Sequence, residues 1–466
     1  MDGRSHIAGR KPDATKTFTQ TVFGGCRMRD LSLWWFCLTL LPWGAFGQTS
    51  PAEDALKSAQ KAYSQGQYSE AESQYLQAER EAESHGPADP RLARILNNLG
   101  VLYQREAKYS EAERALKRAL GFWETQANRE PLDLATTLNN LAALYTFQSR
   151  YAEAEPLYRQ CLALREKSLG SEHPEVANAL NNLGESFYEQ GKLAEAEPLY
   201  RRALFIKENT LEPGDPALAA SLNNLASLYT RQGKYAESES LYKRSLSIRQ
   251  AAFGPEHPDV ANSVNNLASL YSLEGRYSEA EPMYLRSLTM AEKFLGPEHP
   301  DLACGLNNLA ELYFSEKKYA AAEPLLKRAL SIREKALGPE NPLVAQSLDN
   351  LARVLFLEYK QVNVDLLYLR ALAIRKKVYG PESPEAMASL SSLAAAYTRE
   401  GKFPEAEQTY SAELAIITRQ PKPNVPALSA LYFNLADLYA REGKHKKARK
   451  MAEKAKSFRD QQASSS

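Results

Sequence analysis

The side chains whose types and spacing could do chemistry in this chain are mostly asparagines. Pairs of asparagine recur at an interval of 42 residues, beginning with Asn97 and Asn98. The second member of the pair is Asn98, Asn140, Asn182, Asn224, Asn266, Asn308 and Asn350, and it returns once more as Asn434. A side-chain amide offers one acceptor and two donor hydrogens without charge, so a column of them can pair with the backbone of an extended peptide. The chemistry that these side chains suit is the binding of a partner molecule.

Charged side chains occupy neighbouring positions of the same repeat. Arg231 and Arg399 share one position with Arg105, and Arg353 shares another with Glu185. Guanidinium groups suit carboxylates, which they can bind through two parallel hydrogen bonds. We therefore predict that Arg231, Arg353 and Arg399 join the second asparagines in binding a partner. The alternative is a solvated face with ordinary charges.

Residue patterns for catalysis or metal binding are missing from the sequence. His173, His257 and His299 recur, but whole repeats separate them. Because metal–nitrogen bonds are about 2.0–2.1 Å long, these histidines cannot converge on one ion, and we interpret them as part of a connecting turn. No phosphate-binding glycine loop, Gly-x-Ser-x-Gly elbow or His-Glu-x-x-His pair is present. We expect no catalytic residue, no metal and no cofactor.

The elements that carry the asparagines are amphipathic helices. In one copy Leu222, Leu225, Ala226 and Tyr229 follow the spacing i, i+3, i+4, i+7, which places them on one face of a helix. On a helical wheel the second asparagine lies roughly opposite that apolar face. The first lies on its flank, where it could bond a neighbouring helix. A glycine turn at 233–235, a second helix and a Gly-Pro-rich connection at 254–259 complete the unit.

The repeat organises nearly the whole chain. We count ten copies, a shorter one around residues 59–78 and nine full ones, which we number from the copy that holds Leu96. No segment alternates with a period of two, so we expect no strands. A single helix pair cannot bury its apolar face, and stacked pairs make a continuous core. The sequence predicts an all-α solenoid over residues 52–460, with a disordered tail at 461–466.

The repeat resembles the tetratricopeptide repeat of the kinesin-light-chain type. The resemblance rests on the Leu-Asn-Asn-Leu-Ala-x-Leu-Tyr block, on residues 275–282 and 296–303, and on a small residue in the second helix, which is Ala119, Ala203, Ser245 and Ala329 in different copies. It covers roughly residues 52–460 and implies a right-handed superhelix whose first helices line the concave surface. No heptads precede residue 52, so the resemblance is to the repeat and not to a kinesin role. It is closer to bacterial proteins that reuse this repeat.

Two interpretations of the second asparagine column stay open. Family members that bind peptides use asparagine on the concave surface in a similar way, which favours contact with a partner. The other interpretation is that the amides bond neighbouring helices and hold the repeats in register. Asparagine has mediocre helix propensity, so its recurrence in the middle of a helix needs one of these reasons.

The charge balance limits the possible partners of the protein, and the amino-terminal leader indicates its location. The 58 basic and 57 acidic residues nearly cancel, which argues against nucleic acid as a partner. Residues 31–46 form an apolar run after Arg27 and Arg29, in the order typical of a secretory signal. We expect residues 1–47 to be a leader that directs export to a bacterial periplasm or the extracellular space. An uncleaved membrane anchor is the alternative, and it would be the only contact with a membrane.

Together these features predict a non-catalytic scaffold that binds an extended peptide or partner protein in its concave groove. Self-assembly into homo-oligomers and regulation by a short peptide are the alternatives. Three local predictions accompany it. Cys161 stands where sister repeats carry alanine and should be a small core residue. Residues 359–366 replace the usual turn and should be distorted. The basic stretch Lys446 to Arg459 should cap the solenoid, with contact to anionic lipid as the alternative.

Overall fold

A computed structural model of the chain describes residues 51–86, 89–125, 130–359, 364–419 and 424–465. The predicted leader, residues 1–47, lies outside these ranges. Residues 360–363, which belong to the stretch where we predict a distorted turn, also lie outside them. The helix that follows this stretch begins at Asp365. The equivalent helix of the preceding repeat begins at Tyr319, which is four residues earlier in its repeat.

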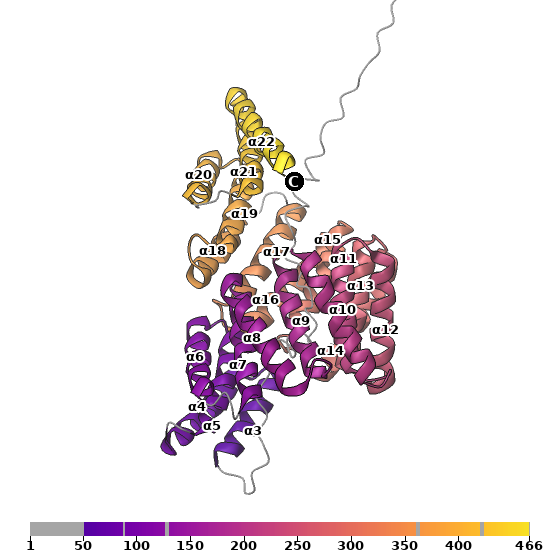
Figure 1. Ribbon diagram of the computed structural model, residues 1–466. Helices are drawn as coiled ribbons and strands as arrows, with labels where there is room; N and C mark the ends of the chain where they lie inside the picture. The colour runs from indigo at the N-terminus through magenta and orange to yellow at the C-terminus, as the bar shows by residue number, and fades with distance from the viewer. Residues whose placement is uncertain (1–50, 87–88, 126–129, 360–363, 420–423, 466) are drawn as a thin grey trace, which may run out of the picture.

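Within the described residues the structure consists of twenty helices that form ten antiparallel pairs (Figure 1). We call the first helix of each pair helix A and the second helix B. The helices A are α3 (Pro51–Ser64), α5 (Pro90–Arg105), α7 (Pro131–Phe147), α9 (Pro174–Glu189), α11 (Ala217–Arg231), α13 (Pro258–Leu273), α15 (Leu302–Ser315), α17 (Pro342–Tyr359), α19 (Pro384–Glu400) and α21 (Val425–Arg441).

The helices B are α4 (Tyr68–Ser84), α6 (Tyr109–Thr125), α8 (Tyr151–Leu169), α10 (Leu193–Thr210), α12 (Tyr235–Phe253), α14 (Tyr277–Leu295), α16 (Tyr319–Leu337), α18 (Asp365–Tyr379), α20 (Phe403–Arg419) and α22 (His445–Ser465). The described residues contain no strand, and the predicted all-α solenoid is confirmed. α22 continues to Ser465 and so runs into the segment 461–466, for which a disordered tail stays a prediction. No glycine or proline follows Asp460 to stop the helix.

The core of each pair follows the predicted spacing. Leu222 and Ala226 are fully buried, and Leu225 and Tyr229 are exposed by less than a tenth. Cys161 is completely buried at the small position of its helix B, as predicted. Burial raises the pKa of the Cys161 thiol to about 11, so it is protonated and inert.

The connections also behave as the residue types predict. Gly233 and Gly254 have φ of +75° and +82°, the left-handed region in which glycine ends a helix without strain. The Nδ1 atoms of His173 and His257 accept the backbone N–H of Glu175 and Asp259 at 3.1 and 3.2 Å. These histidines are caps of helices A and belong to the connecting turn.

A cation near the end of helix B ties most central repeats to the next one. Its side chain donates to a backbone carbonyl ten residues ahead, in the first turn of the next helix A. The bonds are Arg165 to Glu175 at 3.2 Å, Lys207 to Ala217 at 3.1 Å, Arg249 to Asp259 at 3.2 Å and Arg333 to Leu343 at 2.8 Å. Repeat five has Ala291 at this position and cannot make the bond.

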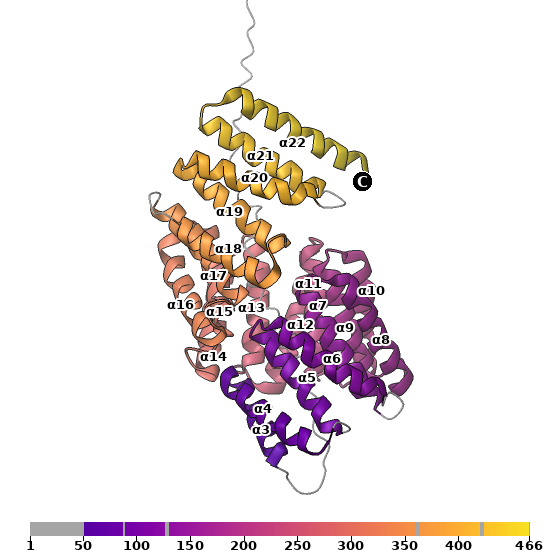
Figure 2. The ribbon, with the colours of Figure 1, turned by 90° about the vertical axis from the view of Figure 1, so that its left-hand side faces the viewer.

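Contacts between successive repeats show which side of the array is concave. Helix A of one repeat contacts helix A of the next from α5 to α15 and again between α19 and α21, whereas successive helices B make hardly any contact with one another. Helices that touch lie on the inside of a curve, so the helices A line the inner surface. Figures 1 and 2 show the array winding back on itself in one turn of the superhelix, and α19 to α22 extend away from that turn.

No helix among the described residues is long and apolar enough to cross a membrane.

Candidate binding surface

The asparagine pairs form a hydrogen-bonded ladder between successive helices A. The second asparagine of a repeat donates its Nδ2 hydrogen to Oδ1 of the first asparagine of the preceding repeat. The rungs are Asn140 to Asn97 at 2.9 Å, Asn182 to Asn139 at 2.6 Å, Asn308 to Asn265 at 3.2 Å and Asn350 to Asn307 at 3.1 Å. Each rung spans 43 residues. This is the contact with a neighbouring helix that we predicted for the first asparagine.

The prediction that the second asparagines face an open groove is corrected for most of the column. Asn98 and Asn140 are fully buried, and Asn182, Asn224, Asn308 and Asn350 are exposed by no more than 6%. A helical wheel treats a helix as isolated, but each helix A here packs between two others at the inner surface. The side opposite the apolar face is therefore also buried. Asn266 and Asn434 are only partly buried.

The ladder is interrupted in the middle of the array. Neither Oδ1 nor Nδ2 of Asn224 has a hydrogen-bond partner within the described residues, although the side chain is 98% buried. Asn181, which would accept the equivalent rung, instead donates its Nδ2 hydrogen to Ser221 Oγ at 2.9 Å, and its own Oδ1 is unpaired. A buried polar group without a partner costs about 1–3 kcal/mol. Asn224 therefore holds a donor and an acceptor ready for another molecule.

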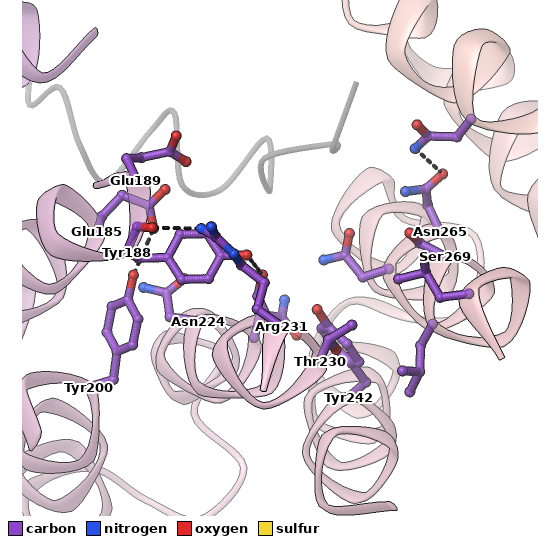
Figure 3. Close-up of a pocket in the computed structure, with 16 residues that line it drawn as sticks. Glu185, Tyr188, Glu189, Tyr200, Asn224, Thr230, Arg231, Tyr242, Asn265 and Ser269 are labelled. Atoms are coloured by element: carbon purple, nitrogen blue, oxygen red, sulfur yellow. Dashed lines mark hydrogen bonds between the residues drawn. The ribbon is translucent and has the colours of Figure 1, made fainter. Parts of the chain in front are cut away.

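A pocket opens at this interruption (Figure 3). It measures about 90 Å³, enough for several water molecules or one side chain of a partner. Helices α9, α11, α13 and α15 supply most of its walls, and α10 and α12 each contribute one tyrosine. Asn224, Asn266 and Asn308 of the predicted column lie in its lining, as does Arg231.

One wall of the pocket depends on a glycine. Gly184 stands where most sister repeats have alanine, and a Cβ atom built on it would lie 2.8 Å from the ring of Tyr200. The missing methyl group lets the ring approach α9. The Tyr200 hydroxyl then donates to Glu185 Oε2 at 2.7 Å and fixes this carboxylate at the edge of the pocket.

The cation of the pocket, Arg231 of α11, reaches the same side of it (Figure 3). Arg231 Nη1 donates to the backbone carbonyl of Tyr188 at 2.6 Å, and its guanidinium group lies 4.5 Å from the centre of the Tyr188 ring. The Arg231 residue is nevertheless exposed to solvent. Leu273, which is 63% exposed, adds an apolar surface to the lining. The pocket thus combines an amide, a carboxylate, a cation and an apolar side chain.

The other two predicted arginines lie elsewhere. Arg353 in α17 is 91% buried with its guanidinium 4.7 Å from the ring of Phe314, and burial lowers its pKa. Arg399 in α19 lies 5.5 Å from the ring of Phe356, and burial is also the main reason why its pKa is lowered. Each arginine packs against an aromatic side chain of the preceding helix A. The structure does not bring them to the pocket.

Sequence reasoning missed the tyrosines of the pocket and the interruption itself. Tyr200 occupies a position at which tyrosine is common in this chain, so nothing in its type marks it, whereas Tyr188 stands at a position where the sister repeats have no tyrosine. Gly184 was the available signal, because it enlarges the space beside Tyr200. The unpaired state of Asn224 depends on Asn181 choosing Ser221, a contact between residues 40 positions apart.

Comparison with protein families gives a consistent result along the chain. A family model described as tetratricopeptide repeat matches residues 54–125, 133–209, 217–293, 301–361, 367–416 and 385–461, and a second model of the same description matches residues 344–385. No curated protein matches the chain.

Three solved structures illustrate the similarity of the repeat. BtubC (BKLC) from P. vanneervenii is 24% identical, with 49% of this chain and 92% of that chain covered and a TM-score of 0.42. A putative kinesin light chain from Podosopora anserina with nearly identical repeats is 28% identical, with 43% and 94% covered and a TM-score of 0.36. A Rap protein complexed with competence and sporulation factor is 13% identical, with 80% and 99% covered and a TM-score of 0.49.

Proposed function

The chain belongs to the tetratricopeptide repeat family, and from this premise we propose that it is a non-catalytic scaffold that binds an extended segment of another protein along its inner surface. The observation that carries the proposal is Asn224, an amide that is 98% buried, unpaired on both polar atoms and part of a pocket lining. Repeats on either side use the same residue type to bond each other. Among the described members of the column, Asn224 is the one whose amide lacks a hydrogen-bond partner on both polar atoms.

The chemistry of the pocket indicates what the segment must present. A peptide amide, in the backbone or in an asparagine or glutamine side chain, matches the donor and acceptor of Asn224. Arg231 suits a carboxylate nearby, and Leu273 suits an apolar side chain. An extended segment can offer all three at successive residues, because side chains along a strand alternate between its two faces.

Peptide binding to paired variants tests the proposal. In a fluorescence-polarisation screen of a random peptide library, we expect the peptides bound by the native chain to lose affinity for Asn224→Ala. Each hydrogen bond lost should cost about 0.5–1.5 kcal/mol, a reduction of roughly two- to tenfold. Asn140→Ala is the matched control, because it removes the same side chain from an intact rung of the ladder, outside the lining of the pocket. Peptides that bind the Asn224 variant with native affinity would place recognition outside this pocket.

Export remains part of the proposal. The leader at residues 1–47 is the reason to place the scaffold in a bacterial periplasm or outside the cell, and the apolar run at 31–46 is the reason to keep a membrane anchor as the alternative. Fractionation of cells that produce the full chain distinguishes three outcomes. Material of reduced mass outside the cytosol supports a cleaved signal, membrane-bound material of full mass supports an anchor, and soluble cytosolic material contradicts both.

Homo-oligomers stay the competing function, since exposed ends of a solenoid can stack. Light scattering of the purified chain at increasing concentration decides the matter. A constant monomer mass contradicts self-assembly, whereas a mass that grows with concentration favours it over the peptide scaffold.

A further inference from the structure

In repeat arrays each repeat contacts only its neighbours. The amino-terminal repeats of this chain depart from that rule. Arg105 Nη2 at the end of α5 lies 2.6 Å from Asp301 Oδ1, although 196 residues separate them. Arg105 belongs to repeat one, and Asp301 lies just before α15, the first helix of repeat six. The winding of the array therefore returns repeat six to its beginning, and Figure 2 shows α3 and α4 next to the lower end of α14.

The contact is a built site and not a chance meeting of surface charges. The Arg105 and Asp301 side chains are 15% and 17% exposed. Arg105 Nε also donates to the hydroxyl of Tyr68 at 3.1 Å, and the Tyr68 ring lies 5.7 Å from that of Tyr63. Exposed ion pairs contribute little because water screens them, whereas a pair enclosed by two tyrosines is held in one geometry.

The connection that carries Asp301 differs from its sister connections. The His299 side chain is 6% exposed, whereas the equivalent His257 side chain is 32% exposed. Pro300 Cδ lies only 3.0 Å from the position that a Cβ atom would take on Gly66, in the turn between α3 and α4. Ala291 leaves this same connection without the cation that ties other central repeats together. The connection is packed against the amino-terminal repeat instead.

Later connections continue the same contact line. The rings of Tyr109 and Tyr379 stack with centroids 6.1 Å apart, and Ser149 Oγ donates to Glu385 Oε1 at 3.3 Å across 236 residues. Leu337, which lies between Asp301 and Tyr379 in the sequence, packs against the core cluster of the amino-terminal repeats. Three successive connections, at 299–301, 337 and 379–385, thus meet the amino-terminal three repeats. We call this contact line the seam.

We propose that the seam is a conformational clasp that holds the superhelix closed, and that its release lengthens the molecule and widens access to the inner surface. The seam is suited to release because it consists of separate contacts at three connections, in contrast to the continuous apolar core between neighbouring repeats. Opening it breaks one ion pair, a ring stack and a few side-chain contacts, and leaves every helix pair intact. The clasp does not depend on the pocket at Asn224 or on peptide binding.

Small-angle X-ray scattering of the full chain tests the clasp. The seam variant combines Asp301→Asn with Tyr379→Ser, which removes the charge of the ion pair and one ring of the stack. The control combines Asp259→Asn with Phe253→Ser, the equivalent positions in repeats that are not part of the seam. We expect the seam variant to have a larger radius of gyration and maximum dimension than the native chain, and the control to superimpose on it. Far-ultraviolet circular dichroism should show native helix content for both.

A second pair of variants guards against failure of the first to fold. Gly66→Ala and Gly275→Ala carry the same backbone strain, with φ of +72° and +76°, but a Cβ atom meets Pro300 and His299 only at Gly66 and nothing within 4 Å at Gly275. Expansion of Gly66→Ala alone supports the clasp. Scattering curves of the seam variant and of Gly66→Ala that match the native curve, or equal expansion of the two controls, would overturn it.

Discussion

Glu413 in α20 gives the sharpest quantitative prediction. It occupies the small position of helix B that is alanine, serine or cysteine in the sister repeats, and it is only 6% exposed. Burial raises the pKa of its carboxyl group from 4.5 to about 7, against the opposing effect of a hydrogen bond from Ser391. The second oxygen, Oε2, has no partner within the described residues. The folded chain therefore favours the protonated form.

The sign and size of the pH effect follow from that shift. Because the pKa is higher in the folded than in the unfolded state, the stabilisation is fully present below pH 4.5 and is lost as pH rises through about 7. Each pH unit between the two values is worth about 1.4 kcal/mol, so repeat eight should lose on the order of 3 kcal/mol between pH 4.5 and pH 9. Glu413→Gln removes the titration and should remove this loss.

Hydrogen exchange of α20 at pH 5 and pH 9, corrected for the intrinsic pH dependence of exchange, measures the effect locally, which a global melt of a solenoid does not. Native protection should fall relative to Glu413→Gln at pH 9 and should be close to it at pH 5. Glu405→Gln is the control, because Glu405 lies on the exposed face of the same helix. If the difference in protection between the native chain and Glu413→Gln is the same at both pH values, the assignment of a buried protonated carboxyl group is wrong.

Three further predictions concern the core, the ladder and the seam. Leu225→Ala should destabilise the chain by about 2–5 kcal/mol, because Leu225 is 95% buried, and a thermal melt without loss would refute its place in the core. Asn140→Ala should cost about 1–3 kcal/mol because it leaves Asn97 Oδ1 buried without its donor, and urea unfolding that matches the native chain would show that the rung contributes nothing. His299 faces Asp301 and Arg105 in the seam, and burial is the main reason that its pKa is lowered from 6.5. The neutral imidazole is therefore the form that the closed seam favours. The stabilisation of the seam by neutral His299 is complete above pH 6.5 and is lost as the pH falls below that value. Scattering should therefore show a longer molecule at pH 5 than at pH 7.5, and His299→Gln should not show this change.

The sequence was sufficient for the helices and for their core. Leu222, Leu225, Ala226 and Tyr229 have a spacing that only a helix turns into one face, and a glycine marks the end of most of the helices. These features depend on neighbours within a few residues, and they recur ten times, so local rules determine them. Glu413 shows that even a buried charge was visible in the sequence, as a carboxylate at a small position, although its protonation could only be judged from its surroundings.

Which asparagine side chains bond a neighbouring helix, and which do not, could be determined only from the tertiary structure. The residues of one helix place Asn140 and Asn224 on the same face, and nothing in their local sequence tells them apart. Only the packing of one helix A against the next shows that Asn140 donates to Asn97, whereas Asn224 has lost its acceptor because Asn181 bonds Ser221. The candidate pocket is a consequence of that difference.

The seam required still more of the structure. Asp301 and Asp259 stand at the same position of the repeat, and the sequence assigns them the same role at the start of a helix. Whether such a residue meets Arg105 depends on the small rotation between neighbouring repeats, summed over five of them. A 42-residue period determines that the array curves, because each repeat stacks on the last in the same way. How far the sum of those rotations brings residue 301 back toward residue 105 is set by the packing of every repeat between them.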